Sequence, residues 1–202
     1  MMSQYLKDKY IIWLLLLVIW STILLFFIDI PLKYADDEKY YIPAGRALIR
    51  GASPLEVNSE HPPLAKYLIG VSEQLFGDPK MLSRILGIAS IIVIYILFTQ
   101  IANKEIALYA LTLLTLDTLY MELYQTAFLD HYATFFITIA ILFYIKYLHQ
   151  KKYLDIMLFS IFAGLAISSK WSVGGIIAVT MIYALIKEDN IVQRLKIFVT
   201  IT

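Results

Sequence analysis

The sequence predicts an all-α protein that crosses the membrane several times. Of its 202 residues, 60% are hydrophobic and only 16% are charged. Soluble domains are about 45–50% apolar and about 25% charged, so this composition is typical of a membrane protein. The apolar residues also come in runs that suit helices crossing a bilayer. We expect residues 1–202 to form one membrane module, with about six complete spans and the start of a seventh.

The first span is predicted at residues 10–28, an almost unbroken run of large apolar side chains. The run is too long for the apolar part of a cleavable signal peptide, and no small-residue cleavage site follows it. Lys7 and Lys9 precede it, and basic residues favour the cytoplasmic side of a membrane. We therefore expect a retained span and a cytoplasmic amino terminus.

Residues 31–80 form a long polar loop between the first two spans. Tyr41 and Ala44 belong to an apolar pattern with helical spacing in its first half, and Gly51 suits the end of that helix. A second helix is expected to begin at Pro63, since proline suits the first helical position. Both helices carry an apolar stripe and are too short to cross a bilayer, so we expect them to lie along the membrane surface.

The rest of the chain consists of apolar runs joined by short polar turns. Asp117 lies inside one of these runs, where we expect it to hydrogen-bond between helices. A last apolar run begins at Leu195 and is the expected seventh span. The other predicted spans cover residues 82–101, 106–120, 127–147, 154–167 and 173–186.

The basic residues of the short loops predict the orientation. Lys104, Lys151 and Lys152 fall on the same side as the amino terminus, whereas Lys170 stands nearly alone on the other. The positive-inside rule therefore places the loop at 31–80 outside, although that loop carries six lysines and arginines of its own. This orientation gathers ten polar residues at the external face: Asp36, Asp37, Glu38, His61, Arg84, Asp117, Glu122, Asp130, His131 and Lys170.

Several kinds of site are excluded or disfavoured by composition. The chain has no cysteine, which excludes disulfides, thiolate metal sites and a cysteine nucleophile. The net charge is +1 and the basic residues do not cluster, so we expect no nucleic-acid partner. The acidic triplet at 36–38 is a conceivable Mg²⁺ or Mn²⁺ site, but no ligand spacing demands a metal. No cofactor is expected to be required.

Carboxylates beside cations at a membrane face suit sugar transfer from a lipid-linked phosphate donor. A carboxylate can take the proton of the attacking hydroxyl. Arginine or lysine can stabilise the charge that develops on the leaving phosphate. A glycoside hydrolase would instead need two carboxylates flanking the bond and an open path for water. The residues therefore slightly favour transfer, with a lipid-linked phosphate sugar as donor and a hydroxyl group as acceptor.

At these residues the chain resembles the N-terminal half of the protein O-mannosyltransferase family. Asp37-Glu38 follows the first span, and His61-Pro62-Pro63-Leu64-Ala65-Lys66 stands where that family has His-Pro-Pro-Leu-Gly-Lys. The aminoarabinose and other lipid A transferases are similar, but usually place lysine before the prolines. Further matching pieces are Tyr40-Tyr41, Arg84, Leu129-Asp130 and the string from Gly164 to Trp171.

The resemblance implies a GT-C-type bundle that transfers a sugar, most simply mannose, from a polyprenyl- or dolichyl-phosphate donor to a serine or threonine of a protein on the external face. It implies that Asp37 is the catalytic base and that Glu38 shapes the acceptor side. Arg84 would bind the donor phosphate, and His61 and Lys66 would line the pocket. Asp130 and Lys170 are expected as supporting substrate-binding residues.

Other interpretations remain open at this point. Members of the family continue through several more spans, so the chain could be a fragment or a partner-dependent, non-catalytic subunit completed by a second membrane protein. A transporter would need ionisable residues near the middle of its spans, whereas here they gather at one face. Each polar group also has a structural interpretation, such as a solvated acidic patch, a helix cap for His61 or an interfacial position for Arg84.

Overall fold

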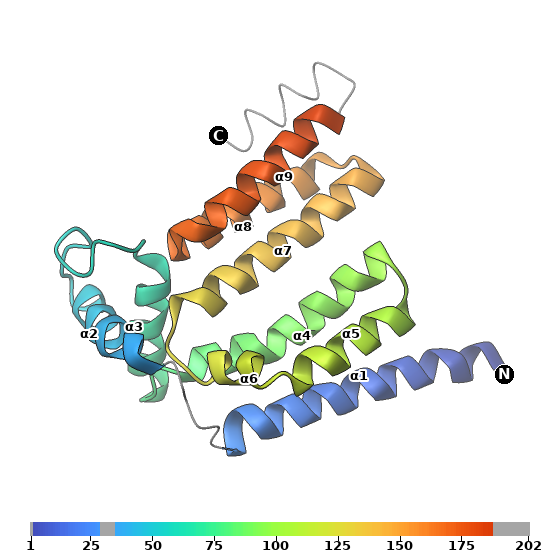
Figure 1. Cartoon of the computed structure of the whole chain (residues 1–202), viewed down its shortest axis with the longest axis horizontal. Coiled ribbons are helices and arrows are strands. Elements are labelled where there is room, and N and C mark those ends of the chain that lie inside the picture. The colour runs from blue at the N-terminus through green and yellow to red at the C-terminus, as the bar shows by residue number, and fades with distance from the viewer. Residues whose placement is uncertain (1, 29–34, 188–202) are drawn as a thin grey trace.

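The computed structural model describes residues 2–28 and 35–187, and this part of the chain is helical and contains no strand. The long helices run side by side in one bundle, and the shorter α2 and α3 sit together at one end of it (Figure 1). The helices are α1 (Met2–Phe27), α2 (Glu38–Ile49), α3 (Leu64–Phe76), α4 (Met81–Ile101), α5 (Lys104–Leu116), α6 (Thr118–Tyr124), α7 (Leu129–Gln150), α8 (Tyr153–Ser169) and α9 (Gly174–Lys187).

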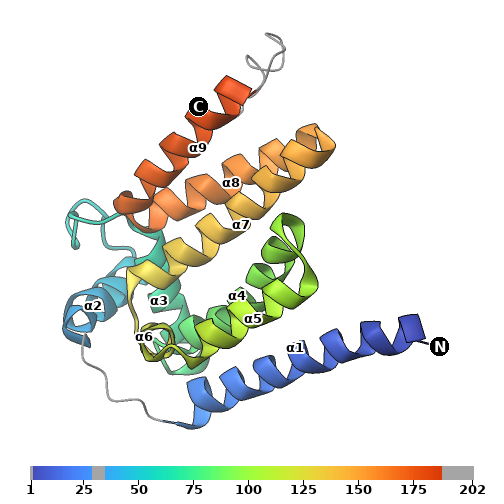
Figure 2. The same cartoon turned by 45° about the vertical axis from the view of Figure 1, so that its right-hand side comes forward.

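From one edge of the bundle to the other, the helices lie nearly in chain order, with α4 and α5 exchanged. In both views α1 lies at one edge and α9 at the opposite edge, with α4 between α5 and α7 (Figure 1, Figure 2). The main buried cluster lies between α7, α8 and α9 and includes Phe159, Ala140 and Ile177. A second cluster joins α2 and α3 to the start of α7 through Tyr41, Ile69 and other buried side chains. The end of the bundle next to α2 and α3 is therefore packed against the loop helices.

Three helices among the described residues are long and apolar enough to cross a bilayer: Lys9–Phe27 within α1, α4 and α7. A fourth span results if α5 and α6 are taken together as one broken helix. The apolar helices α8 and α9 are shorter. The chain is thus a helical membrane protein, while the total of six spans and the cytoplasmic amino terminus stay predictions. The apolar run expected from Leu195 lies outside the described residues.

The break between α5 and α6 corrects the prediction for Asp117. The axes of the two helices differ by 72°. Asp117 lies at this break in extended backbone, and its exposed carboxylate accepts a hydrogen bond of 2.8 Å from Leu119 N at the start of α6. The prediction of a hydrogen bond between helices is wrong, because a short acidic side chain competes for nearby backbone N–H groups and caps a new helix.

Both helices expected in the loop at 31–80 are present, and they pack against each other unusually closely. A Cβ atom added to Gly45 of α2 would lie 2.6 Å from Lys66 O and 2.8 Å from Gly70 N, which are backbone atoms of α3. Arg46 and Glu73 also join the two helices through two hydrogen bonds of 2.6 Å. Because glycine has no side chain, the two backbones can meet directly, and α2 packs tightly on α3.

Candidate active site

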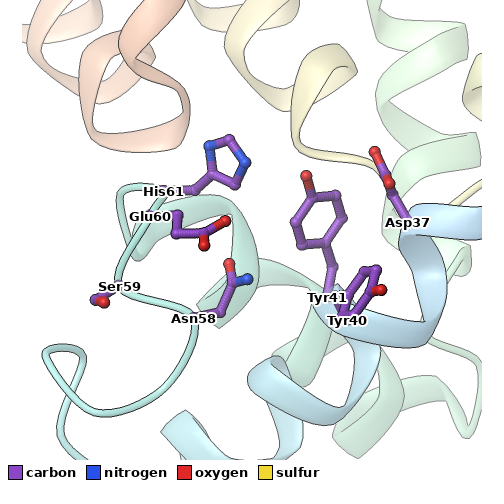
Figure 3. A pocket seen from close by; sticks show the side chains of 7 residues that line it. All are labelled: Asp37, Tyr40, Tyr41, Asn58, Ser59, Glu60 and His61. Atoms are coloured by element: carbon purple, nitrogen blue, oxygen red, sulfur yellow. The ribbon is translucent and has the colours of Figure 1, made fainter.

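A cavity of about 530 Å³ opens between the start of α2 and the segment that leads into α3 (Figure 3). It brings the acidic start of α2 next to a loop that follows in the sequence about two dozen residues later. Figure 3 shows side chains reaching into it from both segments. The lining residues are Asp37, Tyr40, Tyr41, Asn58, Ser59, Glu60 and His61.

Asp37 is positioned by a helix terminus. It ends the short 3-10 helix Ala35–Asp37 and immediately precedes α2, and its side chain is exposed at the edge of the cavity. Its carboxylate has no hydrogen bond or ion pair within the described ranges, 2–28 and 35–187. An exposed carboxylate without such partners is accessible to the hydroxyl of a substrate, as a general base must be.

Glu38 is the neighbour of Asp37 but does not line the cavity. Its Oε1 accepts a hydrogen bond of 2.8 Å from Ala127 N, and its Oε2 lies 2.8 Å from Lys80 Nζ. The side chain is only 13% exposed, so these contacts are largely shielded from water and from screening by salt. Glu38 therefore fixes the start of α2 to the turn before α7 and to the residue before α4. Through that anchor it determines where Asp37 stands.

Tyr41 lies at the centre of the cavity wall. Its ring belongs to the buried cluster around the start of α7 and meets the His61 ring edge-on, with the ring centroids 5.8 Å apart. Burial, together with the negative charges of Asp37, Asp130 and Glu60, raises the pKa of Tyr41 to about 12. The phenol is therefore neutral at any ordinary pH and remains a hydrogen-bond donor.

Lys66 is placed beneath the loop rather than in the cavity. It is fully buried, and its Nζ donates hydrogen bonds of 2.6 Å to Asn58 O and 2.8 Å to His61 O. Burial lowers the pKa of Lys66, because the charged ammonium is removed from water. The resemblance assigned Lys66 to the substrate pocket; its contacts here hold the loop that forms one wall of that pocket.

We expect Lys66→Met to destabilise the protein by about 2 kcal/mol, because two carbonyl oxygens of the loop would lose their charged donor. Limited proteolysis should then cut the segment between α2 and α3 faster, and thermal unfolding in detergent should begin at a lower temperature. Lys39→Met is the matched control, since Lys39 is exposed and its nearest carboxylate, on Asp36, is 3.9 Å away. Equal unfolding temperatures in the two variants would show that Lys66 does not hold the loop.

Arg84 lies at the start of α4 and does not line the cavity. Its Nη1 is 2.7 Å from Asp78 Oδ2, a partner that sequence reasoning missed. The buried Nε of Arg84 has no hydrogen-bond partner in the described part of the chain. A guanidinium has five N–H donors, so one ion pair does not use up its capacity to bind a phosphate. The predicted phosphate contact therefore stays a prediction.

Asp130 and Lys170 form an ion pair from separate elements. Lys170 Nζ is 2.5 Å from Asp130 Oδ1, so the turn after α8 is joined to the first turn of α7. Asp130 also raises the pKa of Tyr41, which places its charge near the cavity. The neighbouring His131 points elsewhere: it is buried, and its Nε2 lies 2.7 Å from Ser83 Oγ in α4.

The structure thus brings Asp37, His61 and Asp130 toward one region, with Tyr41 between them. Five of the seven lining residues were not selected as site residues from the sequence: Tyr40, Tyr41, Asn58, Ser59 and Glu60. A signal for Tyr41 was present, because it follows Asp37 by four positions and residues at that spacing share one face of a helix. Among the described residues, no group of three or more histidine, aspartate and glutamate side chains is arranged to hold a metal ion.

Comparison with known proteins adds one match. Residues 60–202 match the family model described as dolichyl-phosphate-mannose-protein mannosyltransferase. Neither a curated protein nor a solved structure matches the chain. The matched range contains His61, Lys66, Arg84, Asp130 and Lys170. It begins after α2, so the acidic residues at the start of α2 lie outside it.

Proposed function

This chain belongs to the dolichyl-phosphate-mannose-protein mannosyltransferase family, and from that membership we propose that it is a membrane-embedded inverting glycosyltransferase. Its donor is a polyprenyl-phosphate-linked sugar, with mannose the sugar that the family name gives. Its acceptor is a serine or threonine hydroxyl of a protein. The observation that supports this most directly is the exposed carboxylate of Asp37 at the edge of a cavity of about 530 Å³. This cavity lies at the end of the bundle where α2 and α3 are packed.

In the proposed reaction the acceptor oxygen attacks the anomeric carbon from the side opposite the phosphate. Asp37 takes the hydroxyl proton as the new carbon–oxygen bond forms. The bond between the anomeric carbon and the phosphate oxygen breaks, and its electron pair leaves with the phosphate. One displacement of this kind inverts the anomeric centre. Asp37 would act as the base, and Glu38 would hold it in place through Ala127 and Lys80.

The leaving phosphate needs positive charge, and Arg84 is our candidate for it. Its guanidinium is partly buried and retains donors beyond the one used by Asp78. Lys170 is a second cation on this side of the bundle, already paired with Asp130. Charge-assisted hydrogen bonds to phosphate are about twice as strong as neutral ones, so a single arginine can make a large contribution to leaving-group stabilisation.

The test is a transfer assay with the full-length protein in proteoliposomes. Radiolabelled dolichyl-phosphate-mannose and a peptide rich in serine and threonine should yield labelled peptide, and mild alkali should release the label by β-elimination. Dolichyl-phosphate-glucose in a parallel reaction tests the sugar. If transfer appears only after a second membrane protein is added, the chain is a partner-dependent subunit. Uptake of a solute into the liposomes without labelling of any peptide would contradict the proposal in favour of a transporter.

A further inference from the structure

Tyr41 has a rigidly held ring and a hydroxyl directed into the cavity. The residue is only 6% exposed, and its ring packs among Ala65, Ile69 and Leu129 in the cluster that joins α2 and α3 to α7. Figure 3 shows the phenol between His61 and Asp37, with its hydroxyl pointing into the space that they enclose. A side chain held in this way pays little conformational entropy when it binds a ligand.

The hydroxyl of Tyr41 lacks a hydrogen-bond partner within the described ranges, 2–28 and 35–187. The hydroxyl faces the open cavity, where a bound molecule can reach it. Burial, and after it the negative charges of Asp37, Asp130 and Glu60, raise the pKa of Tyr41 to about 12, so the phenol stays protonated and cannot itself act as a base near neutral pH. The Tyr41 hydroxyl can instead donate a hydrogen bond to a bound molecule.

The surrounding charge restricts which oxygen can accept that bond. A phosphate oxygen at this point would lie beside the carboxylates of Asp37 and Glu60, which line the cavity, and would be repelled by both. An uncharged oxygen, such as a peptide carbonyl, carries no such penalty. The cavity next to Tyr41 therefore suits the acceptor protein better than the phosphate of the donor.

We propose that Tyr41 is a further catalytic residue of this site: its hydroxyl donates a hydrogen bond to an uncharged oxygen of the acceptor and orients the acceptor hydroxyl toward Asp37. The inference rests on the proposed sugar transfer. Tyr41 lies in the first turn of α2 and Asp37 directly precedes that helix, so one short segment carries both the proton acceptor and the group that positions the substrate. The two groups keep their spacing even if the wall formed by residues 58–61 moves.

The experiment compares the steady-state kinetics of Tyr41→Phe with those of the wild type, varying peptide and dolichyl-phosphate-mannose separately. Loss of one neutral hydrogen bond should raise KM for the peptide about five- to tenfold and leave KM for the donor unchanged. Phenylalanine keeps the ring and its packing, and an unchanged unfolding temperature would verify this. Tyr67→Phe is the matched control, because Tyr67 lies in the same loop on α3 but does not line the cavity.

The outcomes separate the inference from its premise. An unchanged peptide KM in Tyr41→Phe, beside an active wild type, would overturn the role of Tyr41 and leave the proposed function standing. A rise in donor KM alone would also overturn it, because the hydroxyl would then contact the sugar phosphate. A folded wild type that transfers no sugar from either donor would overturn the proposed function itself.

Discussion

Replacing Asp37 with asparagine should lower the rate of sugar transfer about a thousandfold. The amide has nearly the shape of the carboxylate but cannot accept the proton of the attacking hydroxyl, and a positioned general base contributes about 10²- to 10⁴-fold. Because Asp37 is exposed and has no ion pair in the described part of the chain, removing its charge should leave the fold unchanged. The measurement is a single-turnover transfer reaction with saturating peptide.

Asp36→Asn is the matched control for this substitution. Asp36 precedes Asp37 directly, its side chain is 93% exposed, and it does not line the cavity. The Asp36→Asn substitution therefore removes one negative charge next to the site and leaves the Asp37 carboxylate in place. Equal loss of activity in both variants would mean that these aspartates contribute only their negative charge. Transfer that persists in Asp37→Asn would show that Asp37 is not the base.

Replacing Gly45 with alanine should destabilise the protein by about 3 kcal/mol and abolish most transfer activity. The new methyl carbon would lie 2.6 Å from the carbonyl oxygen of Lys66, and backbone atoms in a helix cannot yield as a flexible side chain can. Overpacking of this kind costs about 1–3 kcal/mol and occasionally more. Since α2 carries Asp37 at its start, separation of α2 from α3 would also displace the base. Thermal unfolding in detergent measures the first effect and the transfer assay the second.

Gly164→Ala provides the comparison. Gly164 lies inside α8, and a Cβ atom added there would meet no atom within 4 Å. Alanine is a better helix former than glycine by about 1 kcal/mol, so this variant should be at least as stable as the wild type. If Gly45→Ala were equally well tolerated, the close packing of α2 on α3 would not be what holds the site together.

Much of the fold was predictable because membrane helices and surface helices leave a periodic pattern in the sequence. The apolar runs predicted α4 and α7 closely, and the stripe through Tyr41 and Ala44 predicted α2. The kink at Asp117 was not predictable in the same way, since the apolar run continues on both sides of it. The helix breaks there because the Asp117 side chain competes with the helix backbone for nearby N–H groups.

The site was predictable in its residues but less so in their contacts. Sequence placed Asp37 and His61 in one loop, and the structure puts both on one cavity. Sequence could not show that the ammonium of Lys66 turns inward to the loop carbonyls, or that Arg84 meets Asp78. Each pairing joins a residue near the start of a helix to the loop just before that helix, and the conformation of such a loop is not evident from its sequence.

The break between α5 and α6 has a consequence for the lipid around the protein. The 13 residues of α5 rise about 20 Å, whereas the hydrocarbon core of a bilayer is about 30 Å thick. The exposed carboxylate of Asp117 marks the end of that helix, and a bare charge is costly in hydrocarbon. We therefore expect lipid headgroups and water to reach Asp117 on this flank, and the bilayer to be thinner beside the end of the bundle where α2 and α3 lie.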